Sequence, residues 1–255
     1  MEIDNQIAAV VTGGASGLGK AVVQSLVAKG ARVALFDLDA DKGAKLAKEC
    51  GGLFVPVDVG DPNSVRDGLK VARAAHGPER VLVTCAGIAP AERTVTKTGP
   101  HDFAIFERAL RVNLTGVFNC ATQAAASMAV LPPITPDGER AVIINTASIA
   151  AYEGQIGQIA YAASKAGVVG MTLPMARDLS RHGIRVVAIA PGLFFTPMIA
   201  AFPQEIQDGL TAKLIFPHRA GDPAEFAAMV LHICVNAMIN GEVIRLDGAY
   251  RMPPA

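Results

Sequence analysis

Residues 12–19 read Thr-Gly-Gly-Ala-Ser-Gly-Leu-Gly, and this glycine-rich stretch decides the fold. An apolar run, Ile7–Thr12, precedes it and a helical pattern, Gly17–Lys29, follows it. A glycine-rich turn between a strand and a helix lets the backbone approach a pyrophosphate, and the helix N-terminus adds free N–H groups and a positive dipole end. We therefore predict a dinucleotide-binding turn; the alternative is a tight turn that serves packing alone. The glycines expected at the cofactor are Gly13, Gly17 and Gly19.

Apolar runs and helical patterns alternate along the rest of the chain. Further strands are predicted at Arg32–Phe36, Leu53–Val57, Val81–Thr84, Ala141–Asn145, Ile184–Ile189 and Glu242–Leu246. Further helices are predicted at Asp39–Glu49, Pro62–His76, Asp102–Met128, Ile159–His182 and Pro223–Asn236. Strands apolar on both faces belong to a parallel sheet covered by helices on both sides, and strict alternation gives a doubly wound α/β fold of the Rossmann type. No repeat or linker divides the sequence, so residues 1–255 are expected to form a single domain for dinucleotide binding and catalysis.

Three stretches are predicted to be loops: Ala89–Pro100, Leu131–Glu139 and Gly192–Pro217. Ligands of open α/β sheets bind beyond the carboxyl ends of the strands. The first and third loops leave those ends, so they are candidate walls of a substrate site, whereas the second should be a surface insertion at the opposite end. The substrate loop, residues 192–217, would have an apolar lining, although such side chains are as often packing as contact. The residues concerned are Phe194, Phe195, Met198, Phe202 and Phe216.

The composition excludes several classes of protein. The chain is 51% hydrophobic and 18% charged, with 23 basic and 23 acidic residues, which argues against disorder and against nucleic acid or an anionic membrane as the main partner. No apolar run is long enough to span a bilayer, and the N-terminal residues resemble neither a signal nor a transit peptide. The cysteines and histidines lack the spacing of metal ligands, so we expect no metal site, and free thiols in a reducing compartment, the cytoplasm.

Asp37 bears on the choice of coenzyme. It ends the second predicted strand, about 20 residues beyond the glycine turn, where an acid accepts hydrogen bonds from the adenosine ribose. Its charge would repel a 2′-phosphate, and no arginine follows it directly, so NAD is favoured over NADP. The alternative is that Asp37 caps the next helix, a role for which Asp39 competes.

Tyr161 and Lys165 are a candidate acid–base pair. Four residues apart on a predicted helix, they share one face. A nearby ammonium lowers the pKa of a phenol, which could then exchange a proton with an alcohol or ketone. Ser148 follows a strand directly and could donate to a substrate oxygen that gains charge. Alone, the pair could be a surface feature and the serine a turn residue.

Together these residues resemble the short-chain dehydrogenase/reductase family. The resemblance spans the whole chain and includes Cys85-Ala86-Gly87, Asn113 and Pro191-Gly192. It implies a Rossmann fold, a homotetramer and a catalytic set of Asn113, Ser148, Tyr161 and Lys165, in which Asn113 helps to hold a water that links Lys165 to solvent. Cys85 departs from the asparagine that many members have before Ala-Gly, with little chemical consequence expected.

Four further segments, residues 142–148, 153–158, 170–178 and 240–248, resemble the type-2 3-hydroxyacyl-CoA dehydrogenases, also called 17-beta-hydroxysteroid dehydrogenases type 10. This resemblance implies oxidation of a (3S)-3-hydroxyacyl-CoA to the 3-oxoacyl-CoA with NAD. It adds Gln158 as a substrate contact and, as cofactor contacts, Ser16, Leu18, Asp58, Val59, Cys85, Ala86, Gly87, Tyr161, Lys165, Pro191, Gly192, Phe194 and Thr196. Asp58 could instead cap the helix that begins at Pro62. The other functions left open are a hydroxysteroid dehydrogenase, a 3-oxoacyl-thioester reductase and a non-catalytic NAD-binding protein.

Overall fold

A parallel sheet forms the centre of the protein in the computed structural model, which describes residues 1–196, 205, 209, 211 and 213–254. Its seven strands run in the order β3-β2-β1-β4-β7-β8-β9, and every neighbouring pair is parallel. The strands are β1 (Ala8–Thr12), β2 (Arg32–Asp37), β3 (Leu53–Pro56), β4 (Val81–Thr84), β7 (Ala141–Thr146), β8 (Ile184–Pro191) and β9 (Val243–Leu246). The order reverses direction beside β1, so β1 and β4 flank the crevice in which this class of fold binds ligands.

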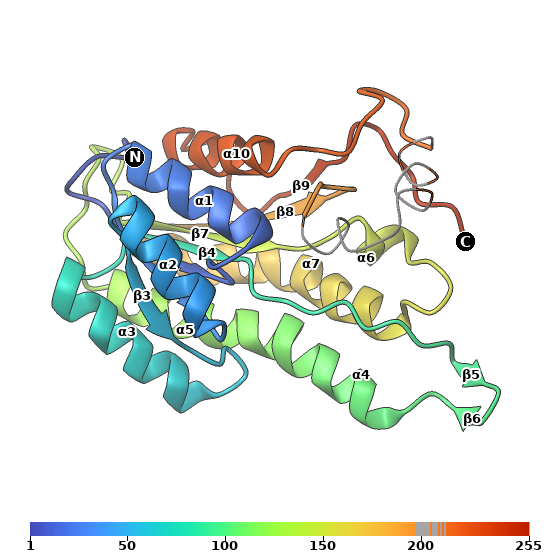
Figure 1. The fold of residues 1–255 in the computed structure, drawn as a ribbon. Helices are drawn as coiled ribbons and strands as arrows, with labels where there is room; N and C mark the ends of the chain where they lie inside the picture. Colours follow the sequence, from blue (N-terminus) through green and yellow to red (C-terminus); the bar gives the residue numbers. More distant parts are fainter. Residues whose placement is uncertain (197–204, 206–208, 210, 212, 255) are drawn as a thin grey trace.

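Helices cover both faces of the sheet (Figure 1), as the alternating pattern predicts. One face packs against α1 (Gly17–Ala28), α2 (Ala40–Cys50) and α10 (Pro223–Val235). The other packs against α3 (Pro62–His76), α5 (Gly116–Met128) and α7 (Ile159–Leu179). Because both faces are covered, the central strands β1, β4, β7 and β8 are buried throughout.

Four local features differ from the sequence prediction. The single helix expected over Asp102–Met128 consists of α4 (Phe103–Leu110), a π-helical turn at Arg111–Thr115 and α5. The loop at residues 89–100 contains a small hairpin of β5 (Val95–Thr96) and β6 (Gly99–Pro100). A short helix, α6 (Ala150–Glu153), follows Ser148, and a 3₁₀ turn at Ser180–His182 ends the segment expected to be one helix with α7.

Aspartates determine where several helices begin. Asp39 accepts a hydrogen bond from the backbone N of Lys42 and caps α2, and Asp61 caps α3 in the same way. The alternative roles of Asp37 and Asp58 as helix caps are therefore wrong, because their neighbours fill those positions. Asp37 and Asp58 lie at the carboxyl ends of β2 and β3, and their carboxylates do not cap a helix.

The loop at residues 131–139 lies at the opposite end of the sheet, as expected, but it is more than a surface insertion. Glu139 is buried and accepts a hydrogen bond of 2.8 Å from Nε of Arg185, a residue of β8 that is also buried. A buried carboxylate needs such a partner. The loop therefore contributes a buried ion pair to the amino ends of the strands.

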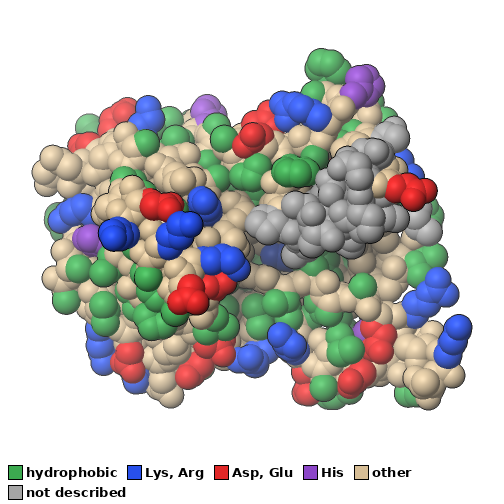
Figure 2. All heavy atoms as spheres, in the orientation of Figure 1, with side chains coloured by type: hydrophobic (Ala, Val, Ile, Leu, Met, Phe, Trp, Pro, Cys, Tyr) green, Lys and Arg blue, Asp and Glu red, His purple; other side chains and the backbone are tan. Residues whose placement is uncertain are grey.

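The surface fits a globular protein with a charged exterior. Figure 2 shows basic and acidic side chains gathered over α2, whose exposed side carries Asp41, Lys42, Lys45 and Lys48. Among the described residues, no helix combines the length and the apolar character needed to cross a membrane, and no cluster of three potential metal ligands occurs.

Candidate active site

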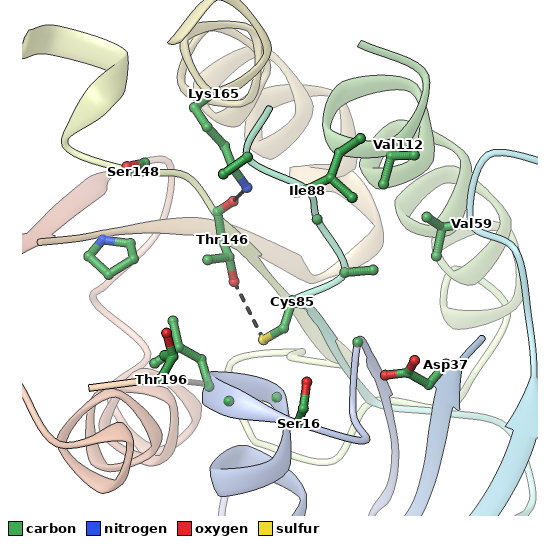
Figure 3. Close-up of a pocket in the computed structure, with 18 of the residues that line it drawn as sticks. Ser16, Asp37, Val59, Cys85, Ile88, Val112, Thr146, Ser148, Lys165 and Thr196 are labelled. Atoms are coloured by element: carbon green, nitrogen blue, oxygen red, sulfur yellow. Dashed lines mark hydrogen bonds between the residues drawn. The ribbon is translucent and has the colours of Figure 1, made fainter. Parts of the chain in front are cut away.

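A cleft of about 490 Å³ lies beyond the carboxyl ends of β1, β2, β3, β4, β7 and β8. Figure 3 shows its labelled side chains converging from separate parts of the chain, with Ser16 and Asp37 at one side and Ser148 and Lys165 at the other. Eighteen of the twenty residues expected at the site line this cleft. They are Gly13, Ser16, Gly17, Leu18, Gly19, Asp37, Asp58, Val59, Cys85, Ala86, Gly87, Ser148, Tyr161, Lys165, Pro191, Gly192, Phe194 and Thr196.

The glycine turn needs its glycines. Gly13 has a φ of +64°, and a Cβ there would lie 2.6 Å from the backbone N of Ala86. A Cβ on Gly19 would run into the carbonyl oxygen of Gly13. The turn therefore packs backbone against backbone between β1, β4 and α1, and leaves its open side to the cleft.

The N-terminus of α1 is free to bind an anion. The helices α2, α3, α4 and α10 each begin with an aspartate whose carboxylate caps the helix. By contrast, within the described part of the chain, Ser16 at the start of α1 caps no N–H group of its own helix, and the first turn holds no acidic residue. Backbone donors and the positive dipole end thus point into the cleft uncompensated.

Asp37 holds the turn from the next strand. Its Oδ2 accepts a hydrogen bond of 3.0 Å from the backbone N of Ala15, and its Oδ1 accepts one of 3.1 Å from the backbone N of Asp39. The carboxylate is therefore fixed at the end of β2 and remains partly exposed at the cleft.

Asp58 and Val59 line the same side of the cleft from the end of β3. Asp58 Oδ1 accepts from the backbone N of Gly60, and its Oδ2 lies 3.1 Å from a guanidinium nitrogen of Arg111. Burial would raise the pKa of Asp58, but these two hydrogen bonds outweigh it and hold the pKa below its usual value. Asp58 thus stays ionised and can accept a hydrogen bond from a ligand.

Cys85 begins the segment that crosses the middle of the cleft (Figure 3). Its Sγ is 3.5 Å from Thr146 Oγ1, and burial raises the pKa of the thiol to about 11. The thiol is therefore neutral, in keeping with the small chemical consequence expected of this departure from the family pattern. Ala86 N donates to Thr12 Oγ1 at 3.2 Å, which ties the segment to β1.

Lys165 and Tyr161 project from α7 into the cleft, with Lys165 Nζ 5.9 Å from the centre of the Tyr161 ring. Nζ donates a hydrogen bond of 2.7 Å to the carbonyl oxygen of Thr146, and burial lowers the pKa of Lys165 to about 8. Burial raises the pKa of the Tyr161 phenol, and a hydrogen bond from Ser148 offsets part of that rise. The sequence led us to expect that the nearby Lys165 lowers the phenol pKa; in the protein without a ligand the pKa is raised instead, because desolvation of the buried phenol is the largest effect.

Ser148 lies two residues beyond the end of β7 and faces Tyr161. Its Oγ accepts a hydrogen bond of 3.1 Å from the backbone N of Ala150, at the start of α6. Because that bond uses the hydroxyl as an acceptor, the hydroxyl can also donate, and here it donates to the Tyr161 phenol.

Asn113 and Gln158 lie outside the residues that line the cleft, as far as the described residues define it. Asn113 is fully buried in the π-helical turn; its Nδ2 donates to the carbonyl oxygen of Ile88 and to Ser164 Oγ, and its Oδ1 accepts from Ile88 N. It therefore fixes the segment that follows Cys85. Gln158 Oε1 accepts from the backbone N of Gln155, so this side chain is engaged in its own loop.

The turn after β8 closes the cleft. Gly192 N donates to the carbonyl oxygen of Leu246 on β9, and Thr196 N donates to that of Phe194. Phe194 is buried, while Phe195 and Phe216 are exposed, so only part of the expected apolar wall is inside the molecule. Two residues of that wall, Met198 and Phe202, lie outside the described residues.

Sequence reasoning missed several cleft residues: Ile88, Arg108, Arg111, Val112 and Thr146. Val112 and Arg111 precede Asn113 in the π-helical turn, and Thr146 ends β7. These residues could have been predicted from their positions, because residues next to one another at a strand end or in a helical turn often line the same site.

Comparisons with known proteins agree with this geometry. The model of the short chain dehydrogenase family matches residues 7–207. The chain belongs to the short-chain dehydrogenase family. Proteins named 3-hydroxyacyl-CoA dehydrogenase type-2 from Drosophila melanogaster and Homo sapiens are each 49% identical to it; the matches cover 96% and 97% of this chain and 97% and 96% of theirs. A crystal structure of 3-hydroxyacyl-CoA dehydrogenase type-2 from Mycobacterium avium superimposes with a TM-score of 0.94 at 44% identity, covering 98% of both chains.

As a short-chain dehydrogenase, the chain is an oxidoreductase that uses a nicotinamide cofactor. The cleft fits such a group: the glycine turn leaves backbone space at Gly13 and Gly19, and the uncapped start of α1 offers donors for a pyrophosphate.

Proposed function

We propose that the protein oxidises a (3S)-3-hydroxyacyl-CoA to the 3-oxoacyl-CoA with NAD, using Ser148, Tyr161 and Lys165 as catalytic residues and Asn113 as their support. The observation that carries the proposal is the convergence of Ser148, Tyr161 and Lys165 in the cleft that also holds the glycine turn and Asp37. A proton-transfer group and a dinucleotide site in one cleft are what hydride transfer requires.

In this proposal Tyr161 removes the hydroxyl proton of the substrate as the carbon–oxygen double bond forms. Ser148 would turn its hydroxyl from Tyr161 to the substrate and donate a hydrogen bond to the same oxygen, which gains charge during the reaction. Lys165 keeps a positive charge beside the phenol while its amine is protonated, near and below pH 8. Bound NAD would accept the hydride and, in its oxidised form, add a positive charge that favours the phenolate.

The residues that would hold the cofactor follow the cleft from end to end. Asp58 and Val59 would contact the adenine, Asp37 the adenosine ribose, and Ser16 and Leu18 of the turn the pyrophosphate. Cys85, Ala86 and Gly87 would lie beneath it. Lys165 and the turn after β8, with Pro191, Gly192, Phe194 and Thr196, would hold the nicotinamide half.

Two features favour NAD over NADP. The partly exposed Asp37 carboxylate would repel a 2′-phosphate, and the residue after it is Leu38 rather than a base. Arg111 is a basic residue that lines the cleft, but its guanidinium is already paired with the Asp58 carboxylate. It is therefore not free to pair with a 2′-phosphate.

The substrate class rests on the relatives named 3-hydroxyacyl-CoA dehydrogenase type-2. Residues 192–217 would form the substrate loop of the single domain, and Gln158 would approach the thioester after turning from its bond with Gln155. A hydroxysteroid remains the second candidate, because an apolar wall such as Phe194 and Phe195 suits a steroid ring as well as an acyl chain.

The family resemblance also leads us to propose a homotetramer. The four cysteines are unpaired, which suits a reducing compartment such as the cytoplasm.

The test is a comparison of NAD reduction rates with short and long (3S)-3-hydroxyacyl-CoAs, 17β-hydroxysteroids and simple secondary alcohols. The proposal expects kcat/KM to be highest with a 3-hydroxyacyl-CoA. Highest kcat/KM with a steroid would select the second candidate, and no turnover of any alcohol would contradict both.

A further inference from the structure

The segment from Ser148 to Tyr161 carries two of the proposed catalytic residues. It is joined to the sheet by β7 at one end and to α7 at the other. Between β7 and α7 it contains the short helix α6 and the connecting residues 154–158. Something outside the segment must therefore hold it, because α6 has only four residues and no side-chain cap.

Glu153, at the end of α6, is the centre of an ionic cluster. Its two carboxylate oxygens lie 2.9 Å and 3.1 Å from the two terminal guanidinium nitrogens of Arg245 on β9, a bidentate pair. Arg245 also lies over the ring of Tyr152, 5.3 Å from its centre, and bonds Asp247 at 2.7 Å through Nε. Bidentate arginine pairs of this kind fix direction as well as distance.

Asp247 joins this cluster to the cofactor side of the cleft. Its side chain is buried against the turn after β8, where a Cβ on Gly192 would lie only 2.8 Å from the Asp247 Cβ. One set of charges therefore contacts both the segment of Ser148 and Tyr161 and the turn expected to hold the nicotinamide.

The C-terminal residues close the cluster from outside. Arg251 pairs with Glu153 at 3.3 Å and with Asp247 at 3.1 Å, and Met252 N donates to Glu153. Farther along, Pro253 and Pro254 accept hydrogen bonds from Gln155 Nε2 and Ile156 N. In Figure 1 the C-terminus lies at the end of the molecule that holds α6.

Apolar contacts and a strained turn support the same arrangement. Tyr250 is buried and packs in one cluster with Ile149 and Leu214. Ala249 has a φ of +63°, a conformation that costs a non-glycine residue energy and persists where its surroundings impose it. Here Asp247 accepts a hydrogen bond from Ala249 N, so the ionic cluster and the turn depend on each other.

We propose that residues 250–254 and the Glu153–Arg245–Asp247–Arg251 cluster are a positioning device, which aligns Ser148 and Tyr161 with the cofactor turn during hydride transfer. This inference rests on the catalytic roles proposed above. None of these four charged residues lines the cleft among the residues that the structure describes, so they act through the segment they hold.

The test uses Glu153→Gln, which keeps the shape and removes the charge, and a chain that ends after Tyr250. The matched control is Glu79→Gln, because Glu79 also has a bidentate arginine partner, Arg73, at 2.6 and 2.9 Å, but lies just before β4, at the opposite end of the sheet. For each protein, kcat, KM, the Kd of NADH, Tm, oligomeric mass and the primary isotope effect with substrate deuterated at C3 are measured.

Both variants should lose kcat by about 10- to 100-fold, since small misplacements of reacting groups have effects of this size. The Kd of NADH and the oligomeric mass should stay as in the unaltered protein, and the isotope effect should rise because hydride transfer becomes slower. Glu79→Gln should lower Tm without a selective loss of kcat.

Unchanged kcat in both folded variants, or an equal loss of kcat in Glu79→Gln, would overturn the positioning role. A loss of kcat that accompanies a changed oligomeric mass would overturn it as well. Tyr161→Phe in the same assay separates this inference from the proposed function: if Tyr161→Phe is inactive and Glu153→Gln is normal, only the positioning role fails.

Discussion

Replacing Asp37 with asparagine should move the coenzyme preference from NAD towards NADP. The carboxylate at the end of β2 accepts hydrogen bonds from Ala15 N and Asp39 N, and asparagine keeps one amide oxygen to accept from Ala15 N. The glycine turn should therefore survive while the negative charge is lost. A phosphate charge about 4 Å from a carboxylate is repelled by about 4 kcal/mol at an effective dielectric constant near 20, and solvent access roughly halves this.

Relief of 2–4 kcal/mol corresponds to a gain of about 30- to 1000-fold in kcat/KM for NADP. NAD should lose about 10-fold or more, because hydrogen bonds from the ribose hydroxyls to a charged acceptor contribute about 1.5–3 kcal/mol. Steady-state kcat/KM with each coenzyme measures both changes. Asp39→Asn is the matched control, since Asp39 lies two residues on, caps α2 and should leave the preference unchanged. If Asp37→Asn keeps the original ratio of NAD to NADP, the reasoning about the ribose site is refuted.

Two further variants test the physical basis of the cleft. Burial lowers the pKa of Lys165 from 10.5 to about 8, so below pH 8 the fold holds a buried ammonium at a cost of about 3 kcal/mol, which is relieved as pH rises from 8 to about 10.5. Lys165→Met should therefore abolish turnover. It should also raise the free energy of unfolding at pH 7, measured by urea titration, by about 1–3 kcal/mol. A lower free energy of unfolding would show instead that the amine stabilises the fold. Gly19→Ala should abolish NADH binding in fluorescence titrations, because its Cβ meets the Gly13 carbonyl, whereas Gly170→Ala on α7 meets open space and should raise stability by up to about 1 kcal/mol. Normal NADH binding by Gly19→Ala would contradict the turn's role.

Much of the fold follows from local sequence signals. The strands that are buried on both faces, such as β4 and β8, read as apolar runs, and glycine and proline mark the turns between elements. The predicted ends differ from the observed ones by a few residues at most, for example at β8, which extends to Pro191.

The cleft was also largely predictable, because parallel strands bring their carboxyl ends to one edge. Asp37 ends β2, and Cys85 and Ser148 follow β4 and β7, so the topology alone assembles them. The direction of the pKa shift of Tyr161 was not predictable from the sequence. It depends on two opposing effects, the burial of the phenol and the nearness of the Lys165 charge, and both are set by the three-dimensional structure.

The remaining features depend on contacts between distant parts of the chain. The π-helical turn around Asn113 is stabilised by hydrogen bonds to Ile88, 25 residues earlier. Glu153 and Arg245 form an ion pair although they are 92 residues apart in the sequence. The residues around each of them do not indicate which residue it will contact. Such contacts are seen in the structure, but they cannot be predicted from the hydrophobic periodicity or the motif spacing of the sequence.

The most direct test of the central claim is the turnover of Tyr161→Phe, measured together with its affinity for NADH. The side chain keeps its ring, so the cleft and the Kd of NADH should stay the same, while kcat should fall at least 100-fold because the group that exchanges the proton is gone. Turnover near that of the unaltered protein would contradict the account, since another group would then have to carry the proton.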